Sequence, residues 1–207
     1  ENAYKTAGMS ANEYMTTVTA LSASLLQSMG GDTAAAAEKA NLAITDMSDN
    51  ANKMGTDMEL IQNAYRGFAK SNYTMLDNLA LGYGGTKEEM ERLLADAEKL
   101  SGIKYDISSY SDVVDAIHVV QTEMGITGTT AKEASTTIQG SVSAMKSAWE
   151  NLVTGVANGN ADIDALIGNL VDSATTVAGN VLPRIEQILN GVGAAVSRFA
   201  PVLSEQV

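Results

Sequence analysis

Apolar side chains recur at steps of three and four residues through residues 129–158. This spacing places them on one face of an α-helix, because a helical turn takes 3.6 residues. Thr130 followed by Glu133 has the form of a capping box, which would start the helix. The stripe consists of Ala134, Ile138, Val142, Met145, Trp149, Leu152 and Val156. We expect this face to pack against a partner, with polar and nearly uncharged side chains on the back.

Three further capping boxes mark helix starts elsewhere in the chain. They are Ser10 with Glu13, Thr56 with Glu59, and Thr86 with Glu89. Asp32 or Thr33, and Ser111, are expected to cap two more helices, while Gly30 and Gly102 follow helical patterns and are suited to ending them. The sequence therefore predicts an all-α fold, a multi-helix bundle that is antiparallel or elongated and broken at glycines, with no significant sheet.

The chemical character of the chain changes near residue 160, which predicts two domains, residues 1–160 and residues 161–207. The second is poor in charge and carries two apolar stripes, at 163–177 and 182–199. Pro183 is placed in the first turn of the second stripe, where its missing N–H costs little. The continuous apolar runs are far shorter than the roughly 20 residues that span a bilayer. Membrane contact by residues 161–207 is kept as an alternative.

Charge and cysteine content exclude several classes of function. The formal net charge is −12, from 13 basic and 25 acidic residues, which argues against direct binding of nucleic acid through its phosphates. The chain has no cysteine, so disulfides, thiolate nucleophiles and cysteine metal sites are all absent.

The residues that most often carry catalysis are few or lack a partner. His118 is the single histidine, and no Gly-x-Ser-x-Gly motif is present to place a serine nucleophile. Acidic side chains near helix starts are expected to stabilise those helix ends; they are Glu88, Glu89, Glu91, Asp112 and Asp115. The cluster of Asp46, Asp49, Asn50 and Asn52 lacks the glycine and glutamate spacing of a calcium-binding EF-hand. The sequence predicts no catalytic residue, metal site or cofactor, and no enzyme.

Four short sequence segments are similar to segments found in a known protein family. They are KTAGMSANEYM at 5–15, AYRGFAK at 64–70, GTTAKEA at 128–134 and SAMKSAWENL at 143–152. In this wording the chain resembles the core region of phage tail tape measure proteins. The resemblance covers roughly residues 1–160, and none of the four strings is a catalytic motif. The chain is expected to be a piece of a longer polypeptide.

The resemblance implies a structural protein of a long-tailed phage or prophage. Such a protein occupies the tail lumen, templates polymerisation of the tail tube, sets tail length, and is thought to help deliver DNA. Its implied partners are the tail tube protein and tail assembly chaperones, and its implied locations are the virion tail and, during assembly, the host cytoplasm. The number of residues in a helix fixes its physical length, because a helix rises about 1.5 Å per residue. A single helix of all 207 residues would measure at most roughly 310 Å.

Two other interpretations remain open at this point. The apolar stripes of residues 161–207 favour a membrane-active or pore-forming helical module as the main alternative. A carboxylate enzyme using Asp112 and Asp115 is a third. In the tape measure interpretation, Ile138, Val142, Met145, Trp149, Leu152 and Val156 are the expected protein contacts, and the helical stripes are expected to allow self-association.

Overall fold

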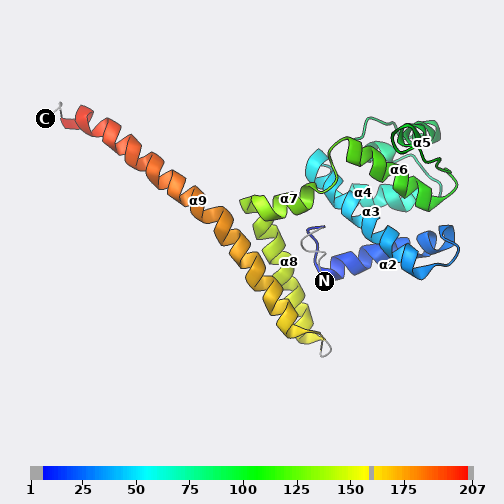
Figure 1. The fold of residues 1–207 in the computed structure, drawn as a ribbon, viewed down its shortest axis with the longest axis horizontal. Coiled ribbons are helices and arrows are strands. Elements are labelled where there is room, and N and C mark those ends of the chain that lie inside the picture. The colour runs from blue at the N-terminus through cyan, green and yellow to red at the C-terminus, as the bar shows by residue number, and fades with distance from the viewer. Residues whose placement is uncertain (1–6, 159–160, 205–207) are drawn as a thin grey trace. The chain divides into compact units, whose positions relative to one another are not determined.

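A computed structural model describes residues 7–158 and 161–204, and for residues 192–204 it describes the backbone only. Within these ranges the chain is all-α, with antiparallel packing of helices and no strand, as the sequence predicts (Figure 1). One 3₁₀ helix, η1, spans Leu76–Leu79. The α-helices are α2 (Ala11–Ser28), α3 (Thr33–Met54), α4 (Met58–Phe68), α5 (Lys87–Ser101), α6 (Tyr110–Glu123), α7 (Thr129–Thr136), α8 (Ile138–Ala157) and α9 (Ile163–Ser204).

The helices form two compact units, Glu1–Lys132 and Glu133–Val207. The predicted domain boundary at residue 160 falls instead inside the second unit, in the connection between α8 and α9. These two helices pack on each other along much of α8, so the chain on both sides of residue 160 belongs to one unit (Figure 1).

The first unit is built around α3, which packs against α2, α4 and α6, while α5 packs against α6. Its core is continuous and consists mainly of aliphatic side chains with a small aromatic group. Tyr65, Phe68 and Tyr73 form that group, with neighbouring ring centroids 5.8 and 6.1 Å apart. The largest other buried side chains are Leu21, Leu25, Ile44, Met47, Ile61, Leu76, Leu79, Met90 and Leu93.

Several predicted helix ends are confirmed. Ser10 and Glu13 form a complete capping box, with the Glu13 amide 3.4 Å from Ser10 Oγ and the Ser10 amide 2.9 Å from Glu13 Oε2. Asp32 caps α3. Thr86 caps α5, although the Glu89 carboxylate accepts from the Gly84 amide at 3.0 Å instead of closing the box. Gly102 ends α5 in the left-handed conformation, with φ at 73°.

Two predicted caps are wrong by two residues or fewer. Asp57, not Thr56, caps α4 by accepting from the Glu59 amide at 2.8 Å. Ser109, not Ser111, caps α6 by accepting from the Asp112 amide at 3.4 Å. In both places neighbouring residues have side-chain oxygens suited to capping, so the sequence alone does not choose between them.

The predicted single helix over residues 129–158 is wrong, because the chain bends at Thr137. There α7 ends and α8 begins, and Thr137 Oγ1 accepts from the Gly140 amide at 3.0 Å. Thr130 lies within the first turn of α7, and its amide is bonded to Asp49 rather than capped by Glu133. Glycine at 140 permits the bend, since an added Cβ would lie 2.5 Å from the Glu133 carbonyl oxygen.

The two predicted C-terminal stripes belong to one helix, α9, which spans 42 residues. Pro183 therefore lies in the helix interior and not in a first turn, so the carbonyl of Gly179 lacks its usual helical donor. Gly155 likewise lies inside α8 and does not end it, while Gly159 lies outside the described residues. Neither Pro183 nor Gly155 therefore marks a helix boundary in the structure.

Candidate interaction surface

The two long helices of the second unit contact each other through small residues. Buried positions on α8 include Ser141, Ala144, Ala148 and Gly155. Gly155 allows the closest approach, because an added Cβ would lie 2.3 Å from Leu166 Cδ1 of α9. These residues recur at helical spacing, so they form a narrow strip on which α9 can lie at short distance. The tight contact of α8 and α9 therefore depends on small side chains on the α8 side, against which Leu166 of α9 packs.

The facing side of α9 is mixed, with half-buried Leu166, Leu170 and Val177 beside polar residues. Ser173 is buried there and donates its hydroxyl to the Asn169 carbonyl at 2.8 Å. At the far end of the pair, the Asn180 amide group donates to the carbonyls of Ser135 at 3.3 Å and Thr137 at 3.1 Å. Residues near 155 thus meet residues near 166, and residues near 137 meet Asn180, which makes α8 and α9 an antiparallel hairpin.

Four of the six predicted contact residues of α8 are exposed, and the other two lie at the edge of the buried strip. Trp149 is 55% exposed and Val156 is 68% exposed, Ile138 and Val142 are also exposed, and Met145 and Leu152 are half-buried. At 100° per residue, the centre of the four exposed residues lies about 105° around the helix from the strip of buried small residues. This exposed part of the α8 stripe is therefore left uncovered within the hairpin.

The large apolar side chains of α9 are exposed in the same way. They include Ile167 and Val171 beside α8, and four further residues beyond Asn180. Those four are Leu182, Ile185, Ile188 and Leu189. Their mean direction lies about 130° around α9 from the side that faces α8. Figure 1 shows α9 continuing well past the end of α8, so these four residues lie where α8 gives no cover.

Both uncovered stripes lie on the same side of the hairpin. On each helix the stripe follows the buried side by about 105–130° in the direction of increasing residue number. The two helices run in opposite directions, so increasing residue number turns clockwise on one helix and anticlockwise on the other when both are viewed from the same end. Similar rotations away from the shared contact therefore bring both stripes to the same side of the hairpin. We call their exposed side chains the apolar face: Ile138, Val142, Trp149, Val153, Val156, Ile167, Val171, Leu182, Ile185, Ile188 and Leu189.

Sequence reasoning identified the α8 half of this face but missed the small-residue strip that leaves it uncovered. A signal for the strip is present, since Ser141, Ala144, Ala148 and Gly155 follow steps of three, four and seven. Hydrophobicity alone points to the larger residues as the packing side, and here it points to the wrong side for the contact with α9.

The first unit contains a charged group at the contact of α3 and α6. His118 Nδ1 lies 2.9 Å from Asp46 Oδ1 and 3.0 Å from Oδ2, so it donates to a carboxylate that is only 1% exposed. The hydrogen bond with Asp46 raises the pKa of His118. Burial raises the pKa of Asp46. Lys39 forms an ion pair with Asp115 beside them. His118 thus holds two helices together, in agreement with a structural role.

Asp49 is fully buried and joins α3 to the start of α7. Its carboxylate accepts from the Gly128 amide at 2.6 Å and from the Thr130 amide at 2.8 Å. Asn50, the next residue, donates to the Leu79 carbonyl and to Gln121 Oε1, both at 2.9 Å. The acidic cluster that loosely suggested a calcium loop is therefore part of α3 and serves the core.

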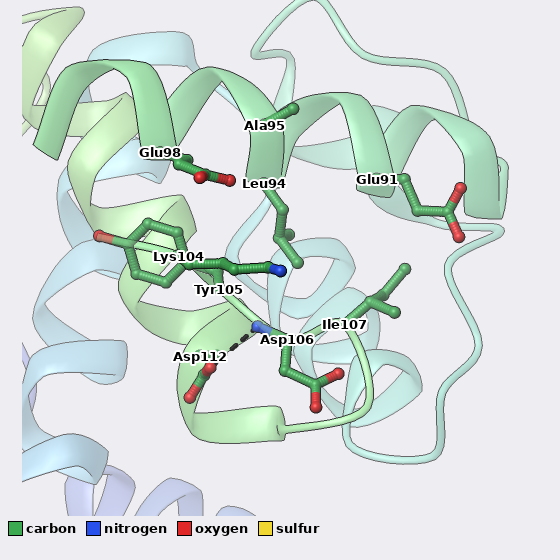
Figure 2. Close-up of a pocket in the computed structure, with 9 residues that line it drawn as sticks. All are labelled: Glu91, Leu94, Ala95, Glu98, Lys104, Tyr105, Asp106, Ile107 and Asp112. Atoms are coloured by element: carbon green, nitrogen blue, oxygen red, sulfur yellow. Dashed lines mark hydrogen bonds between the residues drawn. The ribbon is translucent and has the colours of Figure 1, made fainter. Parts of the chain in front are cut away.

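A cavity of about 570 Å³ lies between α5, the connection 102–109 and the start of α6 (Figure 2). Leu94, Tyr105 and Ile107 supply apolar lining, and the carboxylates come from Glu91, Glu98, Asp106 and Asp112. Asp112 accepts from the Asp106 amide at 2.9 Å, and Asp106 accepts from the Ser108 amide at 2.8 Å. The Asp106 and Asp112 carboxylates therefore stabilise the turn that precedes α6.

The candidate acid–base pair of Asp112 and Asp115 does not share one environment. Asp112 accepts from the backbone of the turn and from the Ser109 hydroxyl, whereas Asp115 pairs with Lys39 on α3. Within the described part of the chain, no three His, Cys, Asp or Glu side chains are grouped so that they could hold a metal ion.

Two further findings concern membrane-spanning helices and similarity to known proteins. Among the described residues, no helix is both long enough and apolar enough to cross a membrane. Searches against models of protein families, curated proteins and solved structures find no match to this chain.

Proposed function

We propose that this chain is a structural protein that works through helix–helix contacts, as the core region of a phage tail tape measure. In this role it templates assembly of the tail tube, sets tail length and takes part in DNA delivery. The observation that carries the proposal is the apolar face, in which eleven large side chains of one hairpin remain exposed. Contiguous apolar surface of this kind marks sites of interaction with other molecules.

The long helix α9 supports the same proposal. Its 42 residues extend about 63 Å at 1.5 Å per residue, so chain length converts directly into distance. The sequence resemblance of residues 1–160 to tape measure proteins also supports the proposal. The proposed partners are the tail tube protein, tail assembly chaperones and further copies of the same chain, and the proposed locations are the tail lumen and, during assembly, the host cytoplasm.

A non-catalytic role agrees with the partners of the ionisable residues. His118 is bonded to Asp46, and Asp112 and Asp115 are engaged by separate neighbours. The net charge of −12 favours protein contacts over direct binding of nucleic acid.

Trp149→Glu in the intact virus tests the contact role. A charge in the middle of the apolar face would be costly to bury against a partner, so we expect few complete tails and a large loss of infectivity. Glu150→Lys is the matched control, because Glu150 lies one residue further around α8 and outside the apolar face. Normal tails and full infectivity from the Trp149→Glu virus would contradict the proposed contact.

A second candidate function is binding to a membrane surface through α9. The observation in its favour is the group Leu182, Ile185, Ile188 and Leu189, which is exposed on one side of a helix. Co-sedimentation of the whole chain with vesicles at low salt tests it, with Ile188→Glu as the variant expected to lose binding. If the unaltered chain stays in the supernatant, this candidate is excluded.

A further inference from the structure

The cavity between α5, the connection 102–109 and the start of α6 has two kinds of lining (Figure 2). One part is apolar and consists mainly of the buried Leu94 with the half-buried Tyr105 and Ile107. The other part is charged. The volume of about 570 Å³ falls within the range of roughly 300–1,000 Å³ that is usual for binding sites. Such a cavity is suited to a ligand that has both apolar and charged groups.

Carboxylates line the cavity from two sides. Glu91 and Glu98 come from α5. Asp106 and Asp112 come from the turn before α6 and from its first turn, on the opposite side in Figure 2. Glu91 and Glu98 are two helical turns apart, so they lie on one side of α5 and about 10 Å from each other along the helix, with Leu94 between them. Acidic groups therefore lie at both ends of an apolar stretch.

The two carboxylates of α5 are weakly engaged by the chain itself. The Glu98 side chain has no hydrogen bond or ion pair within the described residues. Glu91 pairs with Lys87 at 3.3 Å, where both side chains are more than half exposed, and such a pair contributes little free energy. On the other side, hydrogen bonds from the amide and hydroxyl of Ser108 lower the pKa of Asp106, so this carboxylate is charged at neutral pH.

One cationic side chain of the chain itself lies in this cavity. Lys104 is among the lining residues, and in Figure 2 its amine lies between Leu94 on one side and Asp106 and Asp112 on the other. The amine forms no ion pair within the described residues, although its charge adds to the lowering of the pKa of Asp106. The cavity thus accommodates an alkyl stem beside apolar groups and an ammonium near carboxylates, which is how a Lys or Arg side chain of a partner would be bound.

We propose that this cavity is a docking groove for a basic helical segment of a partner protein, in which two Lys or Arg side chains lie on either side of an apolar one. Four carboxylates and one ammonium line the groove, so a cationic segment is attracted to it. Cations seven residues apart on a partner helix lie on one face and about 10 Å apart, which is the spacing of Glu91 and Glu98. The groove lies within the first unit, so this role goes beyond the proposed function and does not use the apolar face.

Binding of defined peptides to the full chain, followed by fluorescence anisotropy, tests the proposal. The probe is a labelled helical peptide of alanine and glutamine with two Arg residues seven positions apart and a Leu between them. A peptide of the same composition with its two Arg residues on opposite faces is the control probe. Spermidine, used as a competitor, carries positive charges and alkyl groups without a peptide.

Two charge reversals of one residue type separate the groove from the overall charge of the chain. Glu98→Lys alters the groove, and it should not unfold α5, because a Lys in the last turn of a helix interacts favourably with the helix dipole. Glu38→Lys is the matched control, since Glu38 is exposed on α3 and does not line the cavity.

We expect Glu98→Lys to weaken binding of the probe by roughly three- to tenfold and Glu38→Lys to change it by less than about twofold. Lys104→Ala should strengthen binding, because it removes the ammonium that the cations of the probe would meet. Equal effects of the two charge reversals would overturn the groove, since the probe would then respond only to the net charge of −12. Equal binding of the two peptides, or tighter binding of spermidine than of the probe, would overturn the helical protein segment as the ligand.

Discussion

At the scale of single residues, the contact between His118 and Asp46 couples the charge of one imidazole to the packing of α3 on α6. The Asp46 carboxylate is 1% exposed and has His118 as its cationic neighbour, while Lys39 is engaged with Asp115. A buried carboxylate without a positive partner costs free energy. The sequence alone gives no sign of this pair, because the two residues are 72 positions apart.

The stability of the first unit is expected to fall as the pH rises beyond about 6.5, the unfolded pKa of histidine. The pKa of His118 is raised in the folded chain, so its contribution is complete below the unfolded value of about 6.5 and is lost as the pH passes the folded value. Urea unfolding followed at about pH 6 and about pH 9 measures the change, with the lower midpoint expected at the higher pH. His118→Gln should remove most of this difference, and an unchanged pH dependence in that variant would contradict the assignment.

At the scale of helices, periodicity in the sequence predicts most of the fold. The positions of α2, α3, α5 and α6 follow from apolar spacing, capping residues and glycines, and the structure confirms them to within a few residues. The bend at Thr137 and the continuity of α9 through Pro183 do not follow from these signals, because the apolar spacing runs on across residue 137 and a proline is equally compatible with a helix start. The uncovered apolar face depends on the small-residue strip of α8, which carries no hydrophobic signal.

Alanine substitution of two helical glycines tests the bend between α7 and α8. Gly140→Ala would place its Cβ 2.5 Å from the Glu133 carbonyl oxygen, a backbone atom that cannot easily move. We expect the free energy of unfolding of the second unit to fall by roughly 1–3 kcal/mol. Gly168→Ala is the matched control in α9, since an added Cβ there meets open space. The control should be neutral or should stabilise by up to about 1 kcal/mol through helix propensity.

Denaturant unfolding of the two variants, with hydrogen exchange at α8 as a local readout, checks this prediction. Equal effects of the two substitutions would show that the close approach at Gly140 is not required for the bend.

At the scale of the whole molecule, the two units differ in where they place their large apolar residues. The first encloses a continuous core and fixes its buried polar groups with Asp49, Asn50 and the His118–Asp46 pair. The second is a hairpin whose buried positions on α8 are small residues, with eleven large apolar side chains exposed among the described residues. The central claim of the proposed function is that these exposed residues are covered when the chain assembles with other chains.

Mean tail length measured by electron microscopy tests that claim most directly, using viruses that carry altered forms of α9. Deletion of residues 185–202 removes five full helical turns and keeps the apolar stripe in phase, and duplication of the same residues adds five. At 1.5 Å per residue, we predict tails shorter by about 27 Å and longer by about 27 Å, respectively. Assembled tails of unchanged length in both viruses would contradict the tape measure role.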